Sequence, residues 1–280
     1  MLLSKKIDGK LPSLFGTLPR CPYTIEPVPE NQAPSEAAGF YIGSDAAVCR
    51  ERERERARES SARNLVYSHE GTIEQCTRPG AFFVNTYDLP SRPRYGMYSL
   101  TLHEAMPGHH LQTALQAELP NLPLFRVYGD WTAFSEGWGL YSESLGVDMG
   151  IYDSDAANFG RLDDEMLRAC RLVVDTGIHM FNWTKTQSVE FILSNSALSE
   201  LEVVSEVERY IGWPGQALAY KSGQLKISSL KSLARKQLGS RFDIRQFHDV
   251  VLGNGAIPLE ILDQQVLAWV QASTPSTNKA

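Results

Sequence analysis

The chain has 280 residues, and its 27 lysines and arginines against 33 aspartates and glutamates give a formal net charge of −6. Hydrophobic residues make up 42% of the sequence and aromatic residues 10%, which excludes disorder throughout and suffices for one large domain or two small ones. The acidic balance argues against a nucleic-acid-binding surface, and the apolar stretches are too short to cross a bilayer, so we expect neither a nucleic-acid partner nor a membrane span.

The N-terminus has no apolar core followed by a small-residue cleavage site, so the sequence predicts no secretory signal and, by default, a cytoplasmic location. Four cysteines, Cys21, Cys49, Cys76 and Cys170, lie far apart and form no CxxC motif. This spacing predicts reduced or buried thiols and neither a disulfide framework nor a structural zinc site.

Three regions follow one another along the chain. Residues 1–48 are rich in proline and glycine and are expected to form extended segments and turns, because proline lacks a backbone donor and disfavours helix in the residue before it. In the charged insert at residues 49–78, arginine and glutamate alternate without an apolar face, which predicts a solvated helix or a disordered segment. The third region begins at residue 79, and residues 80–89 have the aromatic and β-branched content of a strand.

From Tyr98 onward, apolar residues recur at helical spacing, which predicts a mainly α domain preceded by a small β element. Thr184 and Ser199 are expected to cap two of the helices, and Pro214 to end one of them. The predicted helical segments are 98–106, 109–119, 130–150, 160–183, 183–196, 199–213, 216–239 and 257–272.

Three of the six histidines fall in the stretch HEAMPGHH at residues 103–110. Core packing explains such a cluster poorly, and neutral imidazole is the commonest protein ligand for zinc. The usual zincin motif places two histidines four residues apart on a helix, but Pro107 occupies that position here. On an ideal helix neither His109 nor His110 shares an ion with His103. The sequence therefore predicts a metal site at a helix that breaks or bulges at Pro107 and the glycine after it.

A third metal ligand is expected from the helix predicted at 130–150. Glu136, and Glu143 seven positions later on the same face, are acidic residues in an otherwise aromatic and apolar segment. An unpaired carboxylate is costly in such surroundings, so each is a candidate for pairing or metal binding. The competing interpretation is an exposed glutamate on an amphipathic helix.

Four segments, HEAMPGHHLQ, FSEGWGLYSE, RACRLVVDTGIH and RYIGWPGQALAYKSGQLKI, closely resemble in this order the bacterial family catalogued as domain of unknown function 885. The resemblance runs from about Leu11 to Trp269, apart from the charged insert. That family is grouped with the gluzincin metallopeptidases, whose ligands are two histidines and one glutamate. The resemblance implies a zincin-like, gluzincin-type helical metallohydrolase domain at residues 79–280. Family members are typically longer, and the chain resembles their C-terminal, active-site half.

The resemblance also implies roles for individual residues. It makes His103 the first metal ligand, Glu104 the general base and Glu136 the third ligand. The second ligand is His109 or His110, which the sequence does not separate. The implied cofactor is one zinc ion, with other divalent metals as alternatives.

Four further residues are candidates for roles around the metal. Related gluzincins use histidine and tyrosine to stabilise the oxyanion of the reaction, and His179 and Tyr220 are the candidates here. Arg209 and Tyr210 are candidates for binding a substrate carboxylate. For all four, core packing or a structural ion pair is the competing interpretation. Asp175 is a candidate for orienting a ligand histidine through a hydrogen bond.

We therefore expect a zinc-dependent hydrolase, first of all a peptidase acting on a peptide or a small amide, in which Glu104 takes a proton from metal-activated water. The alternatives are a non-catalytic zincin-like binding module and a metal-dependent esterase or amidase. Serine-histidine-aspartate catalysis is not expected, because the sequence has no GxSxG elbow. The sequence leaves the oligomeric state open.

Overall fold

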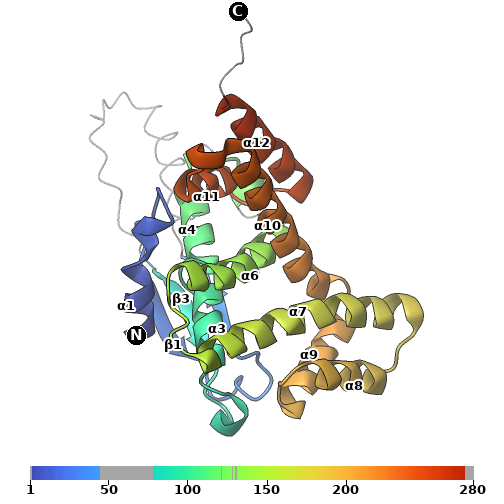
Figure 1. The fold of residues 1–280 in the computed structure, drawn as a ribbon. Helices are drawn as coiled ribbons and strands as arrows, with labels where there is room; N and C mark the ends of the chain where they lie inside the picture. Colours follow the sequence, from blue (N-terminus) through green and yellow to red (C-terminus); the bar gives the residue numbers. More distant parts are fainter. Residues whose placement is uncertain (1, 45–77, 121, 128, 130, 275–280) are drawn as a thin grey trace, which may run out of the picture.

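The computed structural model describes residues 2–44, 78–120, 122–127, 129 and 131–274. These residues form a mainly helical structure with a three-stranded sheet near the N-terminus, which confirms the predicted class (Figure 1). The charged insert predicted at 49–78 lies outside the described residues, except for Arg78. Among the helices that the structure describes, none combines the length and the apolar character that crossing a bilayer requires.

The N-terminal segment contains more regular structure than the extended segments and turns that its composition predicted. It begins with helix α1 (Leu2–Asp8) and the 3-10 helix η1 (Leu11–Ser13), and continues with strands β1 (Tyr23–Pro27) and β2 (Gly39–Ile42). Apolar side chains of α1 and η1 belong to the main hydrophobic core. Packing against that core stabilises a helix too short to form on its own, which explains why the sequence did not reveal it.

Strand β3 (Gly80–Val84) is the central strand of the sheet, whose order is β1-β3-β2. It pairs in parallel with β1, with Tyr23 opposite Gly80, and antiparallel with β2, with Gly39 opposite Val84. The strand predicted at 80–89 is thus confirmed over its first five residues. Through this sheet the first part of the chain is attached to the segment that leads into the helical domain.

The predicted helices are confirmed to within a few residues. Thr184 and Ser199 cap two of them, as predicted, by accepting hydrogen bonds from backbone N–H groups. The helices nearest the site are α3 (Gly96–Glu104), α4 (His109–Glu118), α6 (Thr132–Asp148), α7 (Asp155–Phe181), α9 (Glu200–Gly212) and α10 (Ala219–Leu238). The others are η2 (Leu89–Ser91), α5 (Leu124–Val127), α8 (Lys185–Asn195), η3 (Gln216–Leu218), η4 (Gly239–Arg241), α11 (Ile244–Leu252) and α12 (Leu259–Ala272).

Among the residues that the structure describes, the helices pack into two larger hydrophobic cores, with a small third cluster between α6 and α10. The main core lies between α1, α3, α4, α6, α10, α11 and α12, and a smaller one lies between α7, α8 and α9. In Figure 1, α7 runs away from the main core, and α8 and α9 lie along its far end. Helices α6 and α10 approach each other so closely that the contact has no room for a side chain. A Cβ atom on Gly137 would lie only 2.4 Å from the Cα atom of Gly223. This contact sets the position of α10 relative to the helices of the site.

One cysteine differs from the prediction. Cys21 takes part in a disulfide bond, whereas Cys170 is a buried free thiol as expected. The sequence did not reveal the disulfide because spacing along the chain does not show which cysteines meet in space.

His248, on α11, is completely buried and stacks on Phe15 with 4.6 Å between the ring centroids. Its Nδ1 lies 2.8 Å from the carbonyl oxygen of Leu14, and its Nε2 lies 2.8 Å from the hydroxyl of Tyr141. A carbonyl oxygen only accepts, so Nδ1 carries the proton and Nε2 accepts from Tyr141. Burial lowers the pKa of His248 to about 3, although the hydrogen bond to Leu14 opposes this effect.

This shift predicts a loss of stability in acid. The unfolded chain, with a histidine pKa of about 6.5, binds the proton first, so the contribution of His248 is complete above that pH and is lost as the pH falls toward 3. We expect it to remove about 2 kcal/mol from the free energy of unfolding between pH 8 and pH 5. In His248→Gln the amide can make both hydrogen bonds without titrating. The difference in the free energy of unfolding between pH 8 and pH 5 should therefore be smaller by that amount in the variant. Urea unfolding in the presence of a chelator measures it. An unchanged pH dependence in the variant would contradict this assignment.

Candidate metal centre

The chain leaves helical geometry at the position that the sequence predicted. Helix α3 ends at Glu104, and α4 begins at His109. Between them, the carbonyl oxygen of Pro107 accepts hydrogen bonds from Nε1 of Trp138 at 2.8 Å and from Oγ of Ser142 at 3.3 Å. Both donors belong to α6, so this helix holds the break in place.

Gly108 makes the break tight. A Cβ atom at this position would lie 1.8 Å from the carbonyl oxygen of His103, a distance that no side chain tolerates. The φ angle of Gly108 is −77°, so the residue is required for space and not for a left-handed conformation. The close approach brings the first turn of α4 back against the end of α3.

Four side chains converge beside the break. Oε2 of Glu136 lies 3.4 Å from Nε2 of His103 and 3.3 Å from Nε2 of His109. The two imidazole rings are perpendicular, with 4.7 Å between their centroids. A carboxylate oxygen of Glu104 and ring nitrogens of both histidines lie within 4.8 Å of one another. These residues therefore form one compact cluster of metal-binding atoms.

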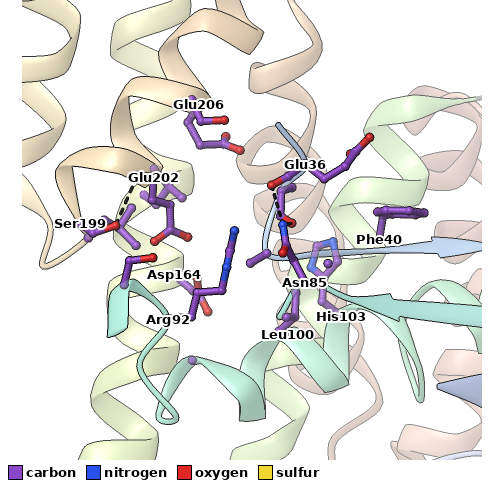
Figure 2. Close-up of a pocket in the computed structure, with 18 of the residues that line it drawn as sticks. Glu36, Phe40, Asn85, Arg92, Leu100, His103, Asp164, Ser199, Glu202 and Glu206 are labelled. Carbon is purple, nitrogen blue, oxygen red and sulfur yellow. Dashed lines mark hydrogen bonds between the residues drawn. The ribbon is translucent and has the colours of Figure 1, made fainter. Parts of the chain in front are cut away.

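The cluster lines a cavity of about 1230 Å³. Figure 2 shows part of this cavity, with His103 on one side and Ser199, Glu202 and Glu206 of the α9 region on the other. The cavity is therefore bounded both by the helices of the main core and by those of the smaller one.

The second ring nitrogen of His103 is occupied by Glu143. Nδ1 lies 2.8 Å from Oε1 of Glu143, and both side chains are buried. The carboxylate accepts a hydrogen bond from Nδ1–H and so directs Nε2 toward Glu136, the usual arrangement of a metal-ligating histidine. The prediction that Asp175 has this orienting role is wrong, because its carboxylate accepts the backbone N–H of Gly215 at 3.0 Å.

The separations in the cluster fit a divalent cation. Four ligands at 2.0–2.1 Å from a tetrahedral ion lie about 3.3–3.4 Å from one another, which matches both distances from Glu136 to the histidines. Oε2 of Glu136 is buried and accepts no hydrogen bond from any residue that the structure describes, an arrangement that is costly unless something else neutralises it.

The charges around the cluster agree with this fit. Burial alone would lower the pKa of His103, but the carboxylates of Glu136 and Glu143 outweigh it and raise the pKa to about 10. The centre thus has an excess of negative charge, which a cation between the ligands would neutralise. The residues present can hold such an ion.

Helix α6 holds His103 between its two glutamates. Glu136 and Glu143 are two turns apart and share one face of the helix. Gly139 lies between them, and a Cβ atom there would come within 2.7 Å of the ring of His103. The imidazole therefore fits into a slot that only glycine leaves open. Sequence reasoning identified both glutamates but missed Gly139, whose spacing of three and four residues from them was the available signal.

His110 points away from the cluster and toward the sheet. Its Nε2 donates to the carbonyl oxygen of Cys21 at 3.0 Å, which leaves Nδ1 to accept from the hydroxyl of Tyr41 at 2.8 Å. Its ring packs against Tyr23, with 4.7 Å between the centroids. Burial lowers the pKa of His110 to about 4, so it stays neutral. Of the two candidates for the second ligand, only His109 lies in the cluster.

Tyr220, in the first turn of α10, stacks on His103 with 6.0 Å between the ring centroids. Its hydroxyl accepts hydrogen bonds from Nη2 of Arg209 at 2.8 Å and from Nε2 of Gln216 at 3.2 Å. The same Nε2 donates to Oε1 of Glu136 at 3.3 Å, and the amide oxygen of Gln216 accepts from Arg209, which fixes the orientation of the amide. Because both neighbours donate, the proton of the Tyr220 hydroxyl remains available to a group in the cavity.

Comparison with known proteins places the chain in a family. Residues 43–266 match the family described as "Bacterial protein of unknown function (DUF885)". The chain belongs to this family. The match confirms the family that the sequence motifs indicated. No curated protein matches the sequence.

Solved structures also resemble this DUF885 protein. One, described as a putative lipoprotein from Colwellia psychrerythraea, is 35% identical with a TM-score of 0.84, and the match covers 96% of this chain and 42% of that one. Another, a putative lipoprotein of unknown function from Shewanella oneidensis, is 19% identical with a TM-score of 0.61, and the match covers 95% of this chain and 53% of that one. The second likeness concerns the fold alone. The DUF885 chain thus spans about half the length of these relatives, or less.

Two of the predicted site residues lie elsewhere in the DUF885 domain. His179 is exposed near the end of α7, does not line the cavity, and donates from Nε2 to the carbonyl oxygen of Tyr210 at 3.0 Å. Tyr210 is buried outside the cavity, and its hydroxyl donates to Glu206 and accepts from Arg171. The structure therefore brings neither His179, predicted to be catalytic, nor Tyr210, predicted to bind substrate, to the cavity. Arg209 does line the cavity.

The slot in α6 makes a specific prediction. In Gly139→Ala the new methyl group displaces the imidazole of His103 from between the two glutamates, so we expect cation affinity to fall by at least about 10-fold, as for other losses of support around a metal ligand. Competition with a chromogenic chelator measures the affinity. Gly212→Ala is the matched control, because a Cβ atom there meets no atom within 4 Å. Equal cation affinity in the two variants would reject the slot.

Proposed function

We propose that this DUF885 protein is a metal-dependent hydrolase, and more specifically a zinc peptidase with a zincin-like, gluzincin-type site. The observation that carries the proposal is the convergence of His103, His109 and Glu136 in one cavity, with the carboxylate of Glu104 beside them. Two imidazoles and one carboxylate form a donor set typical of catalytic zinc, which keeps a fourth position for water or substrate.

The residues of the chain would divide the chemistry among them. A divalent cation, when bound, supplies Lewis-acid polarisation of a carbonyl group and lowers the pKa of water. Glu104 is placed to accept a proton from the attacking water and to pass it to the leaving amine. Burial and the nearby Glu136 raise the pKa of Tyr220, so its hydroxyl keeps the proton that it would donate to the carbonyl oxygen as negative charge develops. Arg209 strengthens this donor by its own hydrogen bond to the hydroxyl.

Metal content and turnover of point variants test the proposal together. We expect His103→Ala and Glu136→Ala to lose most of the metal in elemental analysis. Glu104→Gln should keep the metal and lose orders of magnitude in the hydrolysis of a peptide library, because a general base need not hold the ion. His179→Ala is the matched control for the histidine change, since His179 is exposed and outside the cavity, and it should retain both properties.

Full metal occupancy in both alanine variants would reject the ligand set, and normal activity of Glu104→Gln would reject Glu104 as the base. Metal without hydrolysis of any peptide would favour a non-catalytic zincin-like binding module. Hydrolysis of esters or small amides but not of peptides would favour a metal-dependent esterase or amidase.

A second proposal concerns the location of the protein, which the sequence alone predicted to be cytoplasmic. Disulfides such as that of Cys21 persist in oxidising compartments, and the relative from Colwellia psychrerythraea is described as a putative lipoprotein. We therefore propose a location outside the cytoplasm. Complete alkylation of Cys21 in intact cells, before any reduction, would contradict it.

A further inference from the structure

A cluster of two arginines around one glutamate lies in the cavity wall next to Tyr220. Oε2 of Glu206 is 2.5 Å from Nη2 of Arg171, and its Oε1 is 3.3 Å from Nη1 of Arg209. Arg171 comes from α7, whereas Glu206 and Arg209 are one turn apart on α9. The cluster therefore ties the two helices together at the edge of the cavity.

One carboxylate in this cluster faces two positive charges. Burial opposes ionisation of Glu206, but Arg171 and Arg209 lower its pKa to about 2, so it carries one negative charge. Arg171 is almost fully buried and has the closer contact with this charge. The neighbouring Arg168 pairs with other carboxylates, Asp164 at 2.8 Å and Glu143 at 3.7 Å. Within the cluster of Arg171, Glu206 and Arg209, one positive charge is therefore left over, and Arg209 presents it to the cavity with 29% of its side chain exposed.

Arg209 also has hydrogen-bond donors to spare. A guanidinium has five N–H groups. Among the residues that the structure describes, three acceptors use them: Glu206, the amide oxygen of Gln216 and the hydroxyl of Tyr220. Two N–H groups remain for a ligand, and a planar guanidinium with free donors is the group best suited to hold a carboxylate.

The distance from Arg209 to the metal centre limits where that carboxylate lies in a substrate. Hydrogen bonds of 2.8, 3.2 and 3.3 Å lead from Arg209 through Tyr220 and Gln216 to Glu136. Three such steps place the guanidinium within about 10 Å of Glu136, and an extended peptide advances about 3.3–3.6 Å per residue. A carboxylate one or two residues beyond a bond cleaved at the metal centre therefore reaches Arg209.

We propose that Arg209, backed by the charge of Arg171, is a binding site for a substrate carboxylate placed one or two residues after the cleaved bond. This inference rests on the proposed function and adds the substrate class: peptides that end close to the cleaved bond in a free C-terminal carboxylate, or that carry an aspartate or glutamate side chain there. The first source makes the protein a carboxypeptidase that releases one or two residues. The second makes it a peptidase selective for acidic residues.

The test is a binding measurement on Glu104→Gln protein, which separates recognition from turnover. The probes are dansyl-tetraalanine as the free acid, the same peptide as the C-terminal amide, and dansyl-Ala-Ala-Ala-Glu-amide, each titrated by fluorescence anisotropy with and without added zinc. We expect the free acid to bind at least about 10-fold more tightly than the amide, a ratio typical of a charged hydrogen-bonded pair. In Glu104→Gln protein that also carries Arg209→Gln, this ratio should fall to nearly one.

Two further variants make the result specific. Arg94→Gln, added to Glu104→Gln in the same way, removes an exposed arginine that lines the same cavity and should leave the ratio unchanged, which controls for the loss of overall charge. Arg209→Lys keeps the charge without the planar fork and should give an intermediate ratio. A merely structural role of Arg209 would weaken the binding of all probes equally and leave the ratio intact.

Each outcome decides the matter. Tight binding of the free acid alone supports the C-terminal source, and equal binding of the glutamate probe supports the side-chain source, provided that Arg209→Gln abolishes the preference. Equal affinity for all three probes, no binding of any probe, or a preference that survives Arg209→Gln overturns the inference. The binding measurement needs no turnover. A failure of the wild-type protein to hydrolyse peptides would therefore reject the proposed function but would leave the binding result valid.

Discussion

The imidazole of His103 lies between two carboxylates of α6, and the geometry of the whole site depends on this arrangement. Glu143 accepts a hydrogen bond from Nδ1–H on one side of the ring, so Nε2 on the other side is directed toward Glu136, whose Oε2 also lies beside His109. The ring reaches this position only because α3 packs closely on α6, where Gly139 leaves the space. A substitution that separates these two helices would therefore disturb ligand orientation before it disturbed the fold.

The break between α3 and α4 gives two adjacent histidines different tasks. Successive residues on a helix point about 100° apart, so His109 and His110 cannot both face the cluster around Glu136. His109 joins the cluster, while His110 binds the backbone of Cys21 and the hydroxyl of Tyr41. Strands β2 and β3 line the cavity, and β2 is fastened through Tyr41 to the same turn of helix that brings His109 into the cluster.

Charged side chains form the side of the cavity that α7, α9 and α10 provide. Arg171 pairs with Glu206 and lies over the ring of Tyr220 at 4.5 Å from its centroid, and Arg209 hydrogen-bonds the hydroxyl of the same tyrosine. Buried ion pairs are weak contributors to stability because removing two charges from water is costly. An arrangement that leaves one of two arginines uncompensated and facing a cavity is better explained by the binding of an anion than by stabilisation of the fold.

The sequence by itself determined the features that depend on local order. The histidine cluster, the break at Pro107, the two glutamates on one face of a helix and the caps at Thr184 and Ser199 all follow from residue type and helical spacing. Helix propensity and proline chemistry act over a few residues, so the printed chain contains the information. The family motifs are likewise readable as short segments in a fixed order.

Only the tertiary structure decided which side chain meets which. It selected His109 over His110, gave the orienting role to Glu143 and not to Asp175, and placed His179 and Tyr210 outside the cavity. Each of these choices depends on how one helix is rotated and packed against another. Helical spacing defines the faces of a helix, but packing between elements distant in sequence decides which face looks into the cavity.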